Sequence, residues 1–66
     1  MTLKQYDVAR LLRTLPEHGP AEGAVGTIVT VYEAPGAFEV EFADQDGVTI
    51  ALVALSEEDI ERTQAR

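Results

Sequence analysis

The sequence predicts a small all-β domain, and three features carry that prediction. Residues 38–42 (FEVEF) alternate apolar and acidic side chains, residues 27–33 (TIVTVYE) are rich in β-branched residues, and turn-forming residues lie between these runs. Strict alternation places every second side chain on the same face of a strand. Short strands joined by tight turns predict a small barrel or curled meander, because closing a sheet removes exposed strand edges. A chain of 66 residues is long enough for one domain, 1–66.

The first element, within residues 3–15, is ambiguous. From Val8 onward, apolar residues recur at positions i, i+3, i+4 and i+7, which favours a short amphipathic helix. The alternation expected of a strand is poor in the same segment. Pro16 ends the element in either case, because the residue before proline is disfavoured in the helical region.

A loop and a strand follow. Residues 16–26 hold two prolines and three glycines, which predicts a loop with tight turns. Residues 27–33 then form a strand, whose strict alternation would place Thr27, Val29 and Val31 on one face. The segment 34–37 (APGA) predicts a turn, because proline and glycine suit its two central positions.

The second half begins with the clearest strand, residues 38–42. Its Phe38, Val40 and Phe42 are expected to face the core, and Glu39 and Glu41 to face solvent. The segment 44–47 (DQDG) predicts a hairpin turn. Residues 48–55 (VTIALVAL) are apolar on both faces, which predicts a central strand of the sheet.

The C-terminal segment, residues 56–66, changes character. Ser56 is a favourable helix cap, and Asp59 three residues later resembles a capping box. Acids follow the cap and arginines lie toward the other end, as the helix dipole favours. This pattern predicts a short C-terminal helical turn.

Residues 6–55 as a whole resemble a bacterial domain-of-unknown-function family, number 4926. Residues 25–33 (VGTIVTVYE) and 37–47 (AFEVEFADQDG) carry the resemblance, after a leucine-proline pair and a glycine-rich loop. The resemblance implies an SH3-like barrel of about five strands, with a strand instead of a helix as the first element. It also implies an antitoxin or immunity role, because members of the family often lie beside toxin genes.

Composition excludes several classes of function. The chain has no cysteine, so it has neither a disulfide framework nor a thiolate metal site, which fits the cytoplasm. The net charge of −7 argues against nucleic acid and anionic membranes as partners, because phosphate binding needs clustered Lys and Arg. The same charge would steer the protein toward a basic partner.

No residue pattern indicates catalysis or a cofactor. The single histidine, His18, lies in a predicted solvated loop without a nucleophile beside it. Asp44 and Asp46 echo the start of a calcium loop, but the later ligands are missing, and a hairpin turn explains both residues. We therefore expect no catalytic, cofactor-binding or metal-binding residues.

The predicted function is that of a non-enzymatic protein-binding module, most concretely an antitoxin or immunity protein that covers a basic toxin such as a nuclease. The alternatives are an accessory domain of a larger complex and a solvated acidic face without a partner. Homodimerisation through an edge strand is a further possibility. The acidic residues expected to contact the partner are Glu33, Glu39, Glu41, Asp44, Glu57, Glu58, Asp59 and Glu61.

Overall fold

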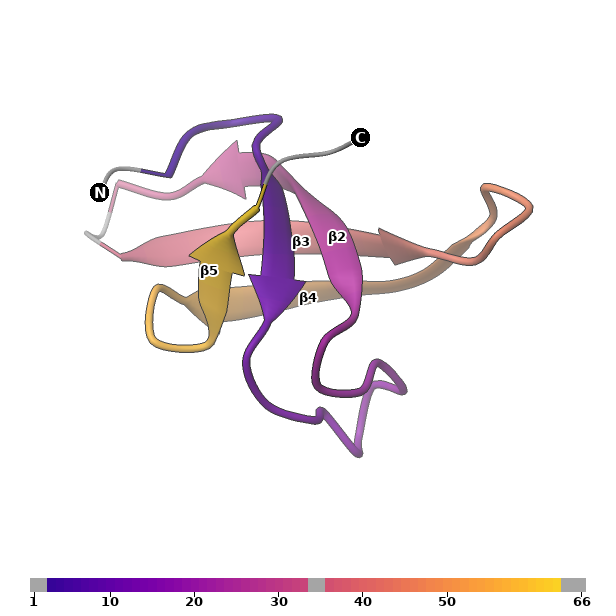
Figure 1. Cartoon of the computed structure of the whole chain (residues 1–66). Coiled ribbons are helices and arrows are strands. Elements are labelled where there is room, and N and C mark those ends of the chain that lie inside the picture. Colours follow the sequence, from indigo (N-terminus) through magenta and orange to yellow (C-terminus); the bar gives the residue numbers. More distant parts are fainter. Residues whose placement is uncertain (1–2, 34–35, 64–66) are drawn as a thin grey trace.

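Five antiparallel strands form a single sheet in the computed structural model, which describes residues 3–33 and 36–63 (Figure 1). The strands are β1 (Val8–Leu11), β2 (Val25–Val31), β3 (Ala37–Ala43), β4 (Thr49–Ser56) and β5 (Ile60–Arg62). The all-β prediction is confirmed, and the described residues contain no helix.

The strand order is β4-β3-β2-β1-β5, so the last strand returns to pair with the first. β4 and β5 therefore lie at opposite ends of the hydrogen-bonded order, although only residues 57–59 connect them. Such a short connection requires the sheet to curl until its two ends approach each other (Figure 1). No ladder joins β4 to β5 among the described residues, so the closure expected of a complete barrel is not observed.

The core fills the inside of the curl. Its largest fully buried side chains are Leu11, Ile28, Val40 and Phe42, one from β1, one from β2 and two from β3. Leu15, from the loop between β1 and β2, is also buried and belongs to the same core cluster. Fully burying an aliphatic or aromatic side chain contributes about 1.5–3 kcal/mol, and such burial has to hold this small domain together without any disulfide.

Gly26 allows β2 and β3 to pack at close range. A Cβ atom at this position would lie 2.7 Å from the backbone oxygen of Glu41 and 2.9 Å from side-chain atoms of Val40 and Phe42. Gly26 lies directly opposite Phe42 in the ladder, so the aromatic ring occupies the space that a side chain would need. The sequence predicted this glycine in a loop, whereas it lies within a strand.

The first element is a strand, as the family resemblance implied, and the helical expectation from periodicity is wrong. Ala9 and Leu11 are buried, whereas Arg10 between them is exposed. β1 is hydrogen-bonded on both sides, to β2 and to β5. These pairings, which join residues far apart in the sequence, override the local helical spacing.

The expected C-terminal helical turn is also wrong. Asp59 N donates to Ser56 O at 2.9 Å, and the Asp59 carboxylate accepts from Ser56 N at 3.1 Å, as in the predicted capping contact. The chain then continues as β5, because Ile60 is buried in the core and pairs with Leu11. The capping residues therefore stabilise a tight turn between two strands. Residues 64–66 of the predicted element lie outside the described residues.

The prediction that residues 48–55 form a central strand is wrong as well. β4 is the end strand of the sheet and pairs only with β3 among the described strands. Val53 and Leu55 face the core, whereas Val48, Ile50 and Leu52 are 59%, 56% and 56% exposed. Leu52 on the outer face of β4, and Ile50 and Val48 beyond a register shift in the β3–β4 ladder, therefore contact solvent and not another layer of protein.

Candidate docking surface

The outer face of β3 carries two carboxylates, as predicted. Glu39 and Glu41 alternate with buried Phe38, Val40 and Phe42, and both are half-buried. In the neighbouring strand β2, Thr30 lies opposite Glu39 and Thr27 lies opposite Glu41. We call Glu39 and Glu41, with these small polar neighbours, the acidic face.

Hydroxyl groups hold both carboxylates of the acidic face in place. The Tyr32 hydroxyl donates to Glu39 Oε1 at 2.6 Å, and the Thr49 hydroxyl donates to Glu41 Oε2. The bond to Glu39 raises the pKa of Tyr32 above its usual value, and desolvation and the negative charge add to the effect. Each carboxylate keeps an oxygen that no described side chain contacts through a hydrogen bond, so the acidic face retains free acceptors.

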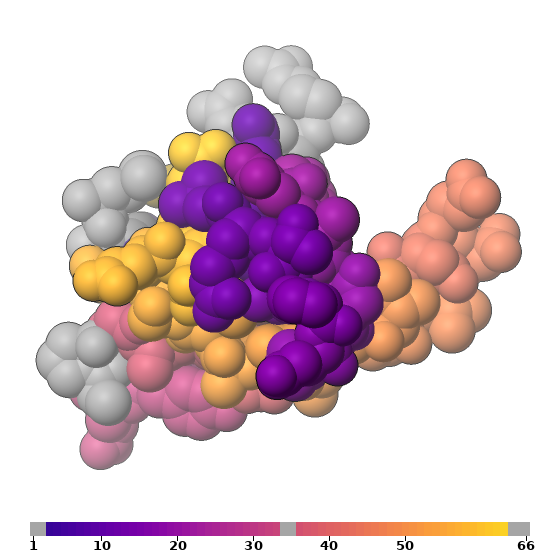
Figure 2. Space-filling view, turned by 90° about the horizontal axis from the view of Figure 1, so that it is seen from below, coloured from indigo at the N-terminus to yellow at the C-terminus, as the bar shows by residue number. Residues whose placement is uncertain are grey.

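An apolar ridge, consisting of Val48, Ile50 and Leu52, borders the acidic face. Leu52 lies directly opposite Glu41 and shares its face, whereas a register shift between Phe42 and Ala43 separates Leu52 from Ile50 and Val48. The hairpin between β3 and β4 stands out from the body of the protein (Figure 2). Asp44 shapes this hairpin, because its carboxylate accepts the backbone N–H groups of Asp46 and Val48 at 2.9 Å each.

The eight acidic residues predicted as contacts do not form one patch. Asp44, Asp59 and Glu61 have structural partners: the hairpin backbone, Arg13 and Arg10, respectively. Glu57 lies beside the turn between β2 and β3, since Glu57 N donates to Gly36 O at 2.9 Å. Glu33 and Glu58 are exposed, the former after β2 and the latter in the β4–β5 turn. Of the predicted residues, the sheet register thus brings Glu39 and Glu41 together as neighbours on one strand face.

Asp59 is the most strongly held of these carboxylates. Its Oδ1 accepts from Arg13 Nε at 2.7 Å, and its Oδ2 accepts from the backbone N–H and the hydroxyl of Ser56 at 3.1 Å each. The bond from Arg13 and those from Ser56 hold the pKa of Asp59 below its usual range. Leu12 N also donates to Asp59 O at 2.8 Å, so Asp59 ties the loop after β1 to the β4–β5 turn.

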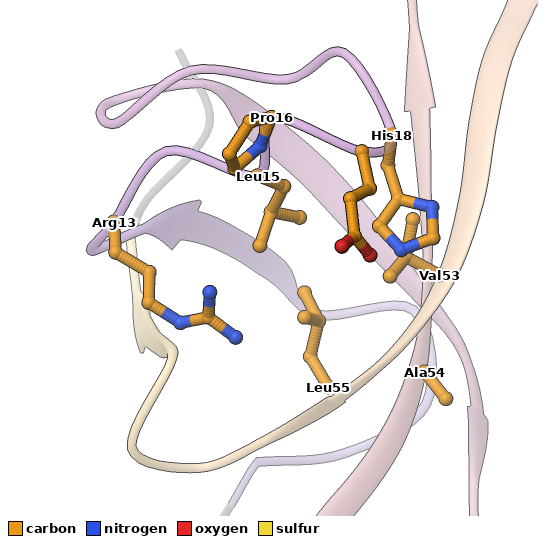
Figure 3. Close-up of a pocket in the computed structure, with 8 residues that line it drawn as sticks. Arg13, Leu15, Pro16, His18, Val53, Ala54 and Leu55 are labelled. Atoms are coloured by element: carbon orange, nitrogen blue, oxygen red, sulfur yellow. The ribbon is translucent and has the colours of Figure 1, made fainter.

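A groove of about 240 Å³ separates this loop from β4 (Figure 3). Small-molecule and cofactor sites usually measure about 300–1,000 Å³. The groove is therefore better matched to one or two side chains than to a cofactor. The lining residues are Arg13, Leu15, Pro16, Glu17, His18, Val53, Ala54 and Leu55.

Within residues 3–33 and 36–63, no group of three or more His, Asp and Glu side chains is placed to hold a metal ion. The same part of the chain contains no helix long and apolar enough to cross a bilayer. DQDG is accounted for by the hairpin, where Gly47 has a φ of 82°.

Sequence reasoning missed the apolar ridge and the role of Tyr32. Both signals were present in the sequence: an eight-residue strand without a single charged residue, and a tyrosine close in sequence to the alternating acids. The uncharged run indicated burial on both faces, and only the strand order places it at the end of the sheet.

The fold and this surface define a small all-β protein with a mixed acidic and apolar face and a narrow groove beside its end strand. Residues 5–62 match a family described as a domain of unknown function, DUF4926. Because this match spans most of the chain, the protein belongs to the DUF4926 family, as the resemblance indicated. No curated protein and no solved structure is significantly similar to the chain.

Proposed function

We propose that this protein is a non-enzymatic binding module that docks a basic protein on the acidic face and the apolar ridge. The observation that carries the proposal is the register of Glu41 with Leu52, which places a half-buried carboxylate beside an exposed apolar side chain. Productive interfaces combine an apolar centre with charges that fix orientation and raise the association rate. The net charge of −7 adds long-range attraction toward a basic partner.

The specific form of the proposal is an antitoxin or immunity protein that acts in the cytoplasm and covers a basic toxin, such as a nuclease. Membership of the DUF4926 family is compatible with this role. The strand order, in which β5 returns to pair with β1, supports an SH3-like barrel as the scaffold. An SH3-like scaffold suits this role because it presents one sheet face to a partner while the core remains intact.

A tagged pull-down from the native host, at low and moderate salt, tests the proposal. We expect one dominant basic protein, whose capture falls as salt rises because exposed charges are screened. The double variant Glu39→Lys/Glu41→Lys should then bind the purified partner more weakly while keeping the far-ultraviolet spectrum of the native sheet.

The matched comparison uses single variants. Glu41→Lys and Glu22→Lys change the net charge equally, but Glu22 lies in the loop between β1 and β2, outside the acidic face. Equal loss of binding in the two variants would mean that only net charge matters and would contradict docking on the acidic face. Capture of a large multi-subunit complex would instead favour an accessory-domain role.

A further inference from the structure

We propose that β4 binds its partner by strand addition, so that an extended basic segment of the partner pairs with the free edge of this strand. The inference rests on the proposed function and specifies how the partner is recognised. Edge strands carry unpaired backbone groups that can pair with another chain, and proteins usually protect them with charges, prolines or bulges. β4 reads TIALVALS and has neither a charge nor a proline, and the one register shift in its ladder lies at the start of the strand, before Ala51.

The register identifies which backbone groups are free. In an antiparallel ladder, residues alternate between those whose N–H and C=O face the neighbouring strand and those whose groups face away. Glu57 N donates to Gly36 O at the end of the β3–β4 ladder, and the register is regular from there to Ala51. Val53 therefore faces β3 with its backbone groups, and Leu52 and Ala54 face away. No backbone outside the ladder bonds to these two residues among the described residues.

The groove lies along this same edge. Val53, Ala54 and Leu55 all line it, although successive side chains of a strand point to opposite faces. A pocket that contacts three consecutive residues therefore runs beside the strand, and β3 already occupies the other side. Figure 3 shows Leu15 and Pro16 across the gap from Leu55, with Arg13 at one end. A side chain on one face of the added strand would be buried in this groove.

The other face of the added strand would meet the acidic face. Ala54 lies directly opposite Glu39, and Leu52 lies opposite Glu41. Neighbouring strands are about 4.8 Å apart, so a lysine or arginine beside Ala54 can extend over this small residue to Glu39. A residue beside Leu52 would contact the apolar ridge. The partner segment is therefore expected to alternate, with basic and apolar residues on one face and apolar residues on the other.

A second copy of this chain is a poorer occupant than a basic segment. Pairing two copies along β4 would place Glu39 and Glu41 of each molecule on one continuous sheet face. Each copy also carries a net charge of −7, so association is opposed by repulsion. A basic segment removes this repulsion and satisfies the same backbone groups.

The probe is the peptide Thr-Lys-Val-Leu-Val-Lys-Thr, acetylated and amidated, which reads the same in both directions. Two N-methylated versions block the backbone N–H groups of alternate residues. In one peptide the two lysines and the central leucine are N-methylated, and in the other the two valines are. Only one set faces β4, so one version should bind at least about tenfold more weakly than the other, since each lost backbone hydrogen bond has a cost. Binding is followed by chemical-shift changes of the Leu52 and Ala54 amides at millimolar peptide.

The outcomes separate the two proposals. Equal binding of both N-methylated peptides, or no localised shifts with the unmodified peptide, would overturn strand addition. If Glu39→Lys/Glu41→Lys still weakened binding of the basic partner in that case, docking on the acidic face would stand. In a third outcome, one N-methylated peptide loses binding while the Glu39→Lys/Glu41→Lys variant binds the unmodified peptide as tightly as the native protein does. That outcome would support strand addition and contradict the role of the acids. A stable dimer of the native protein at physiological salt, with Leu52 and Ala54 amides protected, would overturn the choice of a basic partner.

Discussion

Asp59→Asn tests how strongly one carboxylate ties the loop after β1 to the β4–β5 turn. The Arg13 side chain is 57% exposed, so solvent screening leaves its ion pair with Asp59 only a small contribution to stability. The two bonds from Ser56 resemble those of a helix cap and contribute about 0.5–2 kcal/mol. Asparagine keeps one acceptor oxygen, so we expect a loss of about 1–2 kcal/mol and a Tm lowered by about 5–15 °C in this small domain.

The pH dependence of the same variant has a definite sign. The folded state lowers the pKa of Asp59, so this residue stabilises the fold above its unfolded pKa of about 3.9. That stabilisation is lost as pH falls through the lower folded value. The gap in Tm between the native protein and Asp59→Asn should therefore be full at pH 7 and should shrink below about pH 4.

Thermal unfolding followed by circular dichroism, from pH 7 to pH 3, measures both effects. Glu58→Gln is the matched control, because Glu58 is the exposed neighbour in the same turn. The reasoning is refuted if Asp59→Asn unfolds at the native temperature at pH 7. It is equally refuted if the gap stays constant down to pH 3, because the lost stability would then not depend on the charge of Asp59.

Three further predictions concern the core and the acidic face. Gly26→Ala should destabilise the protein by about 1–3 kcal/mol in urea unfolding, because the new methyl group would lie 2.7 Å from the Glu41 backbone oxygen; an unchanged midpoint would contradict the close approach. Phe42→Ala should cost about 3–5 kcal/mol, enough to leave the chain largely unfolded by circular dichroism, since the ring is 2% exposed. Glu39→Gln should lower the pKa of Tyr32 toward its ordinary value, measured by phenolate absorbance during an alkaline titration, and no change would mean that the hydrogen bond is absent in solution.

Sequence patterns predicted the elements whose structure is set by local alternation. Residues 38–42 form a strand with Glu39 and Glu41 outward, as expected, because alternation alone separates a buried face from a wet one. The strict alternation expected in β2 fails after Ile28, where the register shifts before Thr30. This register shift places Thr27 and Thr30 on the same face as the acids. The sequence of β2 alone does not specify the shift.

Elements whose structure depends on pairing could not be predicted from local pattern. Helical spacing from Val8 and the capping pair at Ser56 are both present, yet both segments are strands because β1 and β5 pair with each other. The acidic residues were likewise predicted as one set because local pattern does not show which of them have structural partners. Their charge is visible in the sequence, but the partners of Asp44, Asp59 and Glu61 depend on turns and ladders between distant residues.

The proposed role of β4 gives a reason why two carboxylates, Glu39 and Glu41, lie one strand inward from this edge of the sheet. An uncharged edge strand is an aggregation hazard, and a charge on the strand itself would be the usual protection. Such a charge beside Leu52 or Ala54 would also obstruct an incoming strand. Glu39 and Glu41 instead lie on β3, directly opposite these residues, where they repel another copy of the same acidic chain without blocking the backbone groups of β4. The arrangement discriminates by charge, because Glu39 and Glu41 attract a basic segment at the edge and repel an acidic one.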